Sequence, residues 1–181
     1  LRPYLLPEER SYIIEYPESC DTAYIRFHLP SNGRFTLTGI IPENDRNGLV
    51  YHAAGINGAD VTAWLNCAHL PQDLRLIRPD LAIFGIGIND ANVPPQSFNP
   101  EQFKARYRKL ISLFKEANPH CALLFITNND CLLNLGRRYG KRTNPNTPKV
   151  VKAFNELAAE HNGAVWDLYH IMGGGRSSAL W

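Results

Sequence analysis

The stretch Leu81-Ala-Ile-Phe-Gly-Ile-Gly-Ile-Asn-Asp90 decides the fold of this chain. Its apolar first half is the pattern of a buried strand, and the Gly-x-Asn-Asp that closes it predicts a turn at the strand's carboxyl end. A second apolar run, Val50-Tyr-His-Ala-Ala54, breaks in the same way into the turn Gly55-Ile-Asn-Gly58. Two such turns can direct a backbone N–H and an Asn side-chain amide at one point, which is the geometry of an oxyanion hole.

Strand and helix patterns alternate from residue 48 to residue 181. Apolar runs predict strands at 50–54, 81–86, 122–126 and 164–167. Between them, apolar stripes at helical spacing predict helices, two of which begin at a capping residue followed by proline. Those caps are Asn99 and Thr147. This alternation predicts an α/β fold with a parallel sheet.

Ligands of such sheets bind at the carboxyl ends of the strands. Several polar and glycine residues of this chain lie at or just past those predicted ends. They are Gly58, Asn89, Thr127, Asn128, Asn129 and Asp167. The sequence therefore places the chemistry at one edge of the sheet.

Residues 1–47 have a different pattern. The segments 12–16, 23–29 and 34–41 are rich in β-branched and aromatic residues, and Pro, Asn and Gly separate them. Apolar and polar residues alternate along 23–29, as in an antiparallel sheet with one wetter face. We therefore predict two regions: part of a small β-sandwich over 1–47, and the α/β domain over 48–181.

Composition excludes few functions. The hydrophobic content of 44% is ordinary for a globular protein, and the net charge of +2 gives no reason to expect nucleic acid. No apolar run reaches the length of a membrane span. The 4 cysteines have no Cys-x-x-Cys spacing, which argues against a zinc site. Cys67 and Cys121 are expected to be buried free thiols, and a disulfide stays open.

The two glycine turns resemble the SGNH (GDSL) hydrolase family, in which a second-block Gly and the Asn of Gly-x-Asn-Asp hold the oxyanion. Gly58 matches the second block, and Gly87, Asn89 and Asp90 match the third. The resemblance implies that Gly58 and Asn89 are catalytic, donating from a backbone N–H and a side-chain amide. The resemblance also implies that the neighbouring residues Asn57 and Asp90 bind substrate. Asp90 is further expected to brace the turn.

The family's nucleophile block, Gly-Asp-Ser, is absent, since no serine upstream of Gly58 follows a Gly-Asp pair. The family's sheet is flavodoxin-like, and the strands predicted here correspond to its second to fifth. The first strand of that sheet is internal. Without it, buried backbone groups would lose their partners at about 1–3 kcal/mol each. We therefore expect another segment, or a second chain, to supply the nucleophile strand.

Some SGNH esterases that act on bacterial cell-wall polysaccharide carry a β-sandwich between the nucleophile block and the second block. Residues 1–47 run straight into Gly58 and resemble the tail of such an insert. That arrangement would place Gly-Asp-Ser upstream of Leu1. The only methionine is Met172, so we expect the chain to be a piece of a longer protein. The resemblance implies a periplasmic or secreted location.

Asp167-Leu-Tyr-His170 has the Asp-x-x-His spacing of the family's last block, which supplies the acid and the base of the catalytic triad. In the family that block follows the last strand in a loop, whereas Asp167 here ends the predicted strand itself. We therefore favour a base located beyond Trp181, and the participation of Asp167 and His170 stays an alternative. The basic residues Arg137, Arg138, Lys141 and Arg142 predict a solvated loop, or else a contact with an anionic glycan.

The resemblance implies a serine esterase that removes O-acyl groups, with O-acetyl groups foremost, from carbohydrate. No metal or organic cofactor is implied. A non-catalytic carbohydrate-binding protein on the same fold is the main alternative, and an unrelated flavodoxin-like binding module is a second one. An esterase needs a Gly-Asp-Ser strand docked beside Gly58, whereas a binding module does not.

Overall fold

The computed structural model describes residues 1–29, 32–44, 46–137 and 140–180. Of the basic cluster predicted from the sequence, Arg138 lies outside the described residues. The chain divides into two compact units, Leu1–Ala54 and Gly55–Trp181. Each unit is described by itself below. Within the described residues, no helix is both long and apolar enough to cross a membrane.

The first unit holds one β-hairpin. Strands β1 (Tyr4–Leu6) and β2 (Ser11–Ile13) pair antiparallel, with Tyr4 opposite Ile13. The prediction of strands at 23–29, 34–41 and 50–54 was wrong for this structure, in which the described residues of those segments form none. The physical reason is that a strand needs a partner and an apolar face to bury. Here the side chains stay exposed, and Tyr24 is 94% accessible.

The second unit alternates helices and strands. Its helices are α1 (Val61–Leu65), α2 (Leu70–Ile77), α3 (Ile88–Ala91), α4 (Pro100–Ala117), α5 (Thr147–His161) and α6 (Leu168–Ile171). Its strands are β3 (Leu81–Phe84), β4 (Ala122–Ile126), β5 (Leu132–Asn134), β6 (Lys141–Thr143) and β7 (Ala164–Trp166), and a 3₁₀ helix spans Ser177–Ala179.

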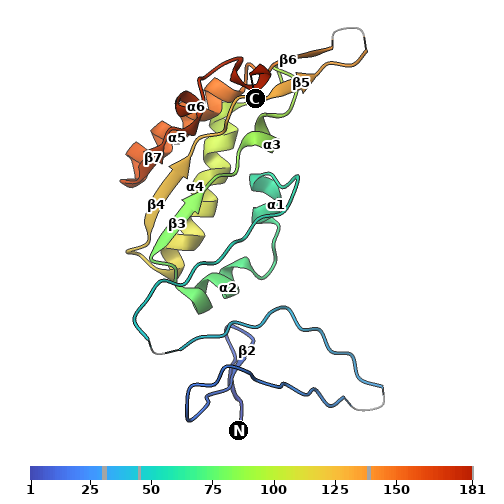
Figure 1. Ribbon diagram of the computed structural model, residues 1–181, viewed down its shortest axis with the longest axis vertical. Helices are drawn as coiled ribbons and strands as arrows, with labels where there is room; N and C mark the ends of the chain where they lie inside the picture. The colour runs from blue at the N-terminus through green and yellow to red at the C-terminus, as the bar shows by residue number, and fades with distance from the viewer. Residues whose placement is uncertain (30–31, 45, 138–139, 181) are drawn as a thin grey trace. The chain divides into compact units, whose positions relative to one another are not determined.

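The central sheet is parallel, in the order β3-β4-β7 (Figure 1). Leu81 lies opposite Ala122, and Leu124 lies opposite Ala164. The predicted α/β class with a parallel sheet is therefore confirmed. The carboxyl ends of the strands all point to the same edge, so the residues that follow them are brought together.

One face of the sheet packs against α4 and α5. Its centre is an aromatic cluster, in which Phe84 meets Tyr107 edge-on at 5.8 Å between ring centroids and Phe125 stacks on Phe84 at 5.4 Å. Phe154 of α5 completes the cluster against Tyr107 at 5.2 Å. Such aromatic pairs add about 0.5–1.5 kcal/mol each beyond the area they bury. The Tyr107 hydroxyl donates to the carbonyl of Ile86, which ties the helix to the end of β3.

The other face of the sheet is open among the described residues. Leu81, Ile83 and Trp166 lie on it and are 52%, 49% and 56% exposed. Their neighbours Ala82 and Phe84 point into the core, so β3 buries only alternate residues. In addition, β3 stands at the edge of the sheet, and no described residue pairs with its outer side.

Side-chain caps begin three of the six α-helices of the described residues, α1, α4 and α6. Asn99 caps α4, and its side chain accepts from the N–H groups of Glu101 and Gln102, as predicted. The predicted cap of α5 was off by one residue, because Thr147 is already helical and Asn146 precedes it. Pro71 lies in the first turn of α2, where a missing N–H costs nothing.

The hairpin β5–β6 was not predicted. It extends the chain beyond the carboxyl edge of the sheet, where the sequence indicated only a loop (Figure 1). Leu132 pairs with Thr143, and Lys141 and Arg142 lie on β6 with exposed side chains. Strands this short give almost no periodic signal in the sequence. Whether these residues form strands therefore depends on their pairing with each other.

Candidate active site

Gly87 allows the chain to turn from β3 into α3. A Cβ atom there would lie 3.1 Å from Val150 Cγ1 and 3.2 Å from Asn128 Oδ1, closer than ordinary van der Waals contact. The neighbouring Gly85 meets nothing within 4 Å. The glycine of the Gly-x-Asn-Asp turn is therefore required by close packing against α5 and the end of β4.

The second predicted turn is formed by residues 56–59. The N–H of Ala59 donates to the carbonyl of Ile56 at 3.1 Å, and Gly58 has a φ of +82°. A positive φ at the third position is the mark of a type II turn, and glycine adopts it without strain. Asn57 and Gly58 are both exposed at the tip of this turn.

Asn89 joins the two turns. Its side-chain Nδ2 donates to the carbonyl of Ala59 at 2.8 Å, across 30 positions of sequence. The structure thus brings together the two segments that sequence reasoning selected. An amide nitrogen carries two hydrogens, so one donor of Asn89 remains for a ligand.

Asp90 ties α3 to the start of α1. Its carboxylate accepts from the N–H of Val61, with distances of 3.2 and 3.4 Å to the two oxygens. Burial raises the pKa of Asp90, the Val61 hydrogen bond opposes the shift and the nearby Asp60 adds to it, so that the pKa is raised overall to about 6. This contact braces the turn that carries Asn89.

Asp167 and His170 form a hydrogen-bonded pair at the end of β7. His170 Nδ1 lies 2.6 Å from Asp167 Oδ2, and the other carboxylate oxygen accepts from the His170 N–H and from the Thr127 hydroxyl. Burial tends to raise the pKa of Asp167, but the hydrogen bonds from His170 outweigh it and lower the pKa overall. The pair also serves as the N-cap of α6. Both a structural cap and an acid–base pair fit this geometry.

Asn128, at the end of β4, is a polar residue to which the sequence assigned no role. Its side chain is buried, and neither amide atom has a hydrogen-bond partner among the described residues. Asn144 and Asn146 were also missed. Both donate to the carbonyl of Ala91, at 2.8 and 3.1 Å, and Asn146 also donates to that of Val93. They hold the loop between α3 and α4, and the Asn-rich stretch 144–146 was the only signal of this.

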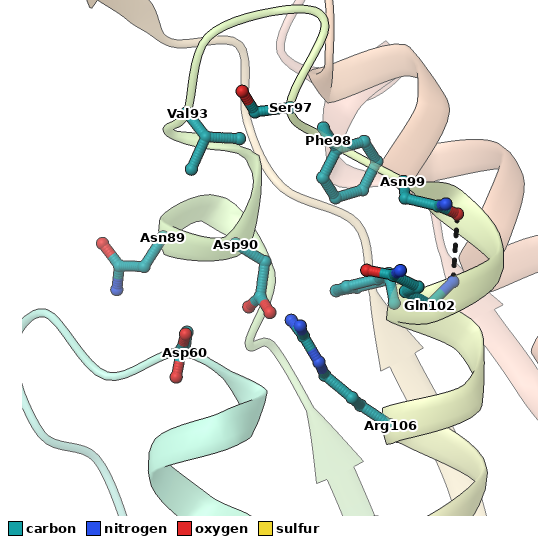
Figure 2. Close-up of a pocket in the computed structure, with 10 residues that line it drawn as sticks. Asp60, Asn89, Asp90, Val93, Ser97, Phe98, Asn99, Gln102 and Arg106 are labelled. Carbon is teal, nitrogen blue, oxygen red and sulfur yellow. Dashed lines mark hydrogen bonds between the residues drawn. The ribbon is translucent and has the colours of Figure 1, made fainter.

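A pocket of about 200 Å³ opens beside Asn89 and Asp90. Figure 2 shows Arg106 of α4 directed at Asp90, with Asp60 on the opposite side and Gln102 next to Arg106. Phe98 lines the pocket at its apolar end. None of Asp60, Gln102 or Arg106 was predicted, because their distance in sequence hides their proximity.

The fold and these two turns define an α/β protein with a candidate site at the carboxyl edge of a parallel sheet. Residues 37–180 match the model of the GDSL-like lipase/acylhydrolase family, and the chain belongs to that family. The resemblance to SGNH (GDSL) hydrolases is thereby confirmed. No individually curated protein matches the chain.

Two solved structures match part of this chain. A peptidoglycan O-acetylesterase is 22% identical, with a TM-score of 0.55, over 66% of this chain and 34% of that one. A lipase/acylhydrolase from Enterococcus faecalis is 24% identical, with a TM-score of 0.46, over 64% of this chain and 54% of that one. The chain thus spans about a third and about half of these proteins. The similarity to the peptidoglycan O-acetylesterase is a similarity of fold.

Proposed function

We propose that this chain is the core of a serine esterase that removes O-acyl groups, in particular O-acetyl groups, from carbohydrate. The observation that carries the proposal is the hydrogen bond from Asn89 Nδ2 to the carbonyl of Ala59. This bond holds the Gly58 turn and the Asn89 turn against each other in a member of an acylhydrolase family. Each turn also has a hydrogen bond of its own, from the Val61 N–H to Asp90 beside α3 and from the Ala59 N–H to the Ile56 carbonyl around Gly58.

In the proposed mechanism, Gly58 and Asn89 form the oxyanion hole. A serine hydroxyl attacks the ester carbonyl while a histidine takes its proton, and the carbonyl oxygen gains the negative charge. The N–H of Gly58 and the second amide hydrogen of Asn89 would donate to that oxygen. As the intermediate collapses and the ester C–O bond breaks, the histidine gives its proton to the departing sugar oxygen, and water then hydrolyses the acyl-enzyme by the same steps. Asn57 would contact the substrate, as would Asp90 at the pocket.

The nucleophile in this proposal comes from a segment outside residues 1–181, or from a second chain. Two features support it. The outer edge of β3 carries backbone groups with no strand partner among the described residues, and such an edge is a template for another strand. The open apolar face with Leu81 and Ile83 would also be covered by an added layer. A strand beside β3 would end at the edge of the sheet where Asn89 lies.

The carbohydrate part of the proposal has a different support. The structural neighbour with a TM-score of 0.55 is a peptidoglycan O-acetylesterase, which acts on an acetylated glycan. A substrate of this kind would place the protein outside the cytoplasm, in the periplasm or secreted. The assignment of residues 1–47 to an inserted β-rich domain belongs to the same proposal.

The test is hydrolysis of 4-nitrophenyl acetate by the full-length protein that contains this chain, with Asn89→Ala as the variant. We expect the rate constant kcat to fall about 100- to 1000-fold, because one oxyanion donor is lost. Asn92→Ala is the matched control, since Asn92 ends the same short helix and its side chain lies outside the pocket. A fluorophosphonate should label a serine in the active protein.

Two results would contradict the proposal. An Asn89→Ala protein with native kcat would remove Asn89 from the oxyanion hole. A native protein that neither labels nor hydrolyses, yet binds glycan, would establish a non-catalytic carbohydrate-binding protein instead.

A further inference from the structure

We propose that the pocket beside Asn89, called here the Arg106 pocket, binds one uncharged sugar ring of the substrate. It is defined by Asp60, Asn89, Asp90, Phe98, Gln102 and Arg106. This inference rests on the proposed function and deepens it, because it names the residues that would select a neutral glycan.

Three elements build the walls of the pocket. Asn89 and Asp90 come from α3, Asp60 precedes α1, and α4 supplies Gln102 and Arg106. The last two are four positions apart on one helix, so their side chains lie on the same face. Figure 2 shows Arg106 and Asp60 entering from opposite sides, with Asp90 between them. Four of these residues therefore lie on helices, Asp60 lies at the start of one, and Phe98 comes from the loop between α3 and α4.

The charges of the pocket oppose one another. Asp60 caps α1 by accepting from the N–H of Ala63 at 2.7 Å, and Asp90 accepts from Val61. Arg106 faces Asp90 and lowers its pKa, yet no described residue forms a hydrogen bond to its guanidinium. An anionic ligand attracted by Arg106 would meet the two carboxylates, and a cationic ligand would meet Arg106. A charge of either sign on the ligand would therefore meet a like charge in the pocket, which favours a ligand without net charge.

Hydroxyl groups can form hydrogen bonds with both the accepting and the donating side chains of the pocket. The carboxylates of Asp60 and Asp90 only accept, the guanidinium of Arg106 only donates, and the amide of Gln102 does both. A ligand that serves all of them needs polar groups that donate and accept at neighbouring positions. The hydroxyls of a sugar ring have this property, and the apolar end at Phe98 suits the C–H face of such a ring.

Size and position complete the argument. The volume of about 200 Å³ is below the roughly 300 Å³ at which pockets for larger ligands begin, so it suits a single ring. Asn89 belongs both to this pocket and to the proposed oxyanion hole. A sugar in the pocket would therefore hold its own acyl ester next to the oxyanion donors.

Binding without turnover tests this inference separately from the esterase activity. The full-length protein is titrated by calorimetry with three tetramers: N-acetylglucosamine (neutral), glucosamine (cationic) and galacturonate (anionic). We expect the neutral tetramer to bind most tightly, with little dependence on salt. Tighter, salt-dependent binding of a charged tetramer, or no binding of the neutral one, would overturn the proposal.

Variants then locate the site. Arg106→Met and Gln102→Leu keep much of each side-chain stem and remove the polar groups. We expect Arg106→Met to weaken binding of the neutral tetramer about 10- to 100-fold, because a hydrogen bond to a charged group is lost. It should also strengthen binding of the cationic tetramer, since the two carboxylates are no longer opposed. Gln102→Leu should weaken binding of the neutral tetramer about three- to tenfold.

Lys109→Met is the matched control, because Lys109 is a cation on the same helix that lies outside the pocket. It should bind all three tetramers as the native protein does. Native affinity in both Arg106→Met and Gln102→Leu would overturn the proposal even if the esterase is active. Conversely, sugar binding that depends on Arg106 in a protein without esterase activity would contradict only the proposed reaction.

Discussion

At the scale of single residues, this site depends on groups that are buried or tightly packed. Asp90 is the clearest case, because its carboxylate is buried beside α1 and α3 and accepts from the backbone N–H of Val61. Burial penalises the charged form of such a group more than one hydrogen bond compensates. The same residue therefore braces the oxyanion turn and makes it sensitive to pH.

We expect the free energy of unfolding to fall as pH rises through Asp90's titration. The pKa of Asp90 is raised from 3.8 to about 6 in the folded protein, so between these values the folded state holds a proton that the unfolded state has lost. Stability then decreases between about pH 4 and pH 6, by at most about 2–3 kcal/mol, and is level above that range.

Asp90→Asn removes this titration while keeping an oxygen that can accept from Val61. Its free energy of unfolding, measured by urea denaturation across pH 4–7, should lack the decrease seen in the native protein. An equally steep profile in the variant would assign the pH dependence to other groups.

Gly87 gives a second residue-scale prediction. Gly87→Ala puts a methyl group 3.1 Å from Val150 Cγ1, and we expect it to destabilise the protein by about 1–3 kcal/mol through overpacking. Gly85→Ala is the control, because its Cβ would meet nothing within 4 Å. Thermal unfolding of the two variants measures the difference. Equal melting temperatures would mean that α5 shifts to accommodate the methyl group without loss of stability.

At the scale of elements, the ends of the strands matter more than their middles. β4 and β7 are followed directly by the polar residues Thr127 and Asp167, and β3 is followed by the glycine turn that leads to Asn89. At the end of β7, the carboxylate of Asp167 accepts from the N–H of His170, its imidazole and the Thr127 hydroxyl. The contact stabilises the start of α6 whether or not the pair takes part in chemistry.

His170→Ala separates the two roles of this pair. Because the proposed base lies outside this chain, we expect the variant to hydrolyse 4-nitrophenyl acetate at the native rate. The exposed imidazole contributes less than about 1 kcal/mol to stability, so unfolding should change little. Asn155→Ala, on the neighbouring helix α5, serves as control. A fall in kcat of about 10⁴-fold would instead identify His170 as the base.

At the scale of the whole molecule, the second unit buries only one face of its sheet. The face with Leu81, Ile83 and Trp166 is open among the described residues, and β3 has a free edge. A three-stranded parallel sheet is usually covered on both faces. The proposed nucleophile segment would complete both the edge and the layer.

Ile83→Lys tests this layer. In the full-length protein we expect fluorophosphonate labelling of the serine to fall at least tenfold, because a charge on this face would disturb the docked segment. Ala105→Lys is the control, since Ala105 lies on the exposed side of α4. Labelling of Ile83→Lys at the native level would show that the face stays open to solvent.

The sequence by itself determined the local elements and the candidate residues of this protein. The strands β3, β4 and β7 and the helices α4 and α5 follow from apolar periodicity, Asn and Pro caps, and short turns, which act over a few residues. The glycine turns at Gly58 and Gly87 were visible for the same reason, and the family assignment agrees with them.

Only the tertiary structure decided which of these elements find partners. The segments 23–29, 34–41 and 50–54 have strand composition but no partner strand, so they stay unpaired. The Arg106 pocket was also decided only by the tertiary structure, because its residues come from three separate parts of the chain. They include Asp60, Asp90 and Arg106. Pairing and burial depend on contacts between distant segments, and a local pattern does not contain that information.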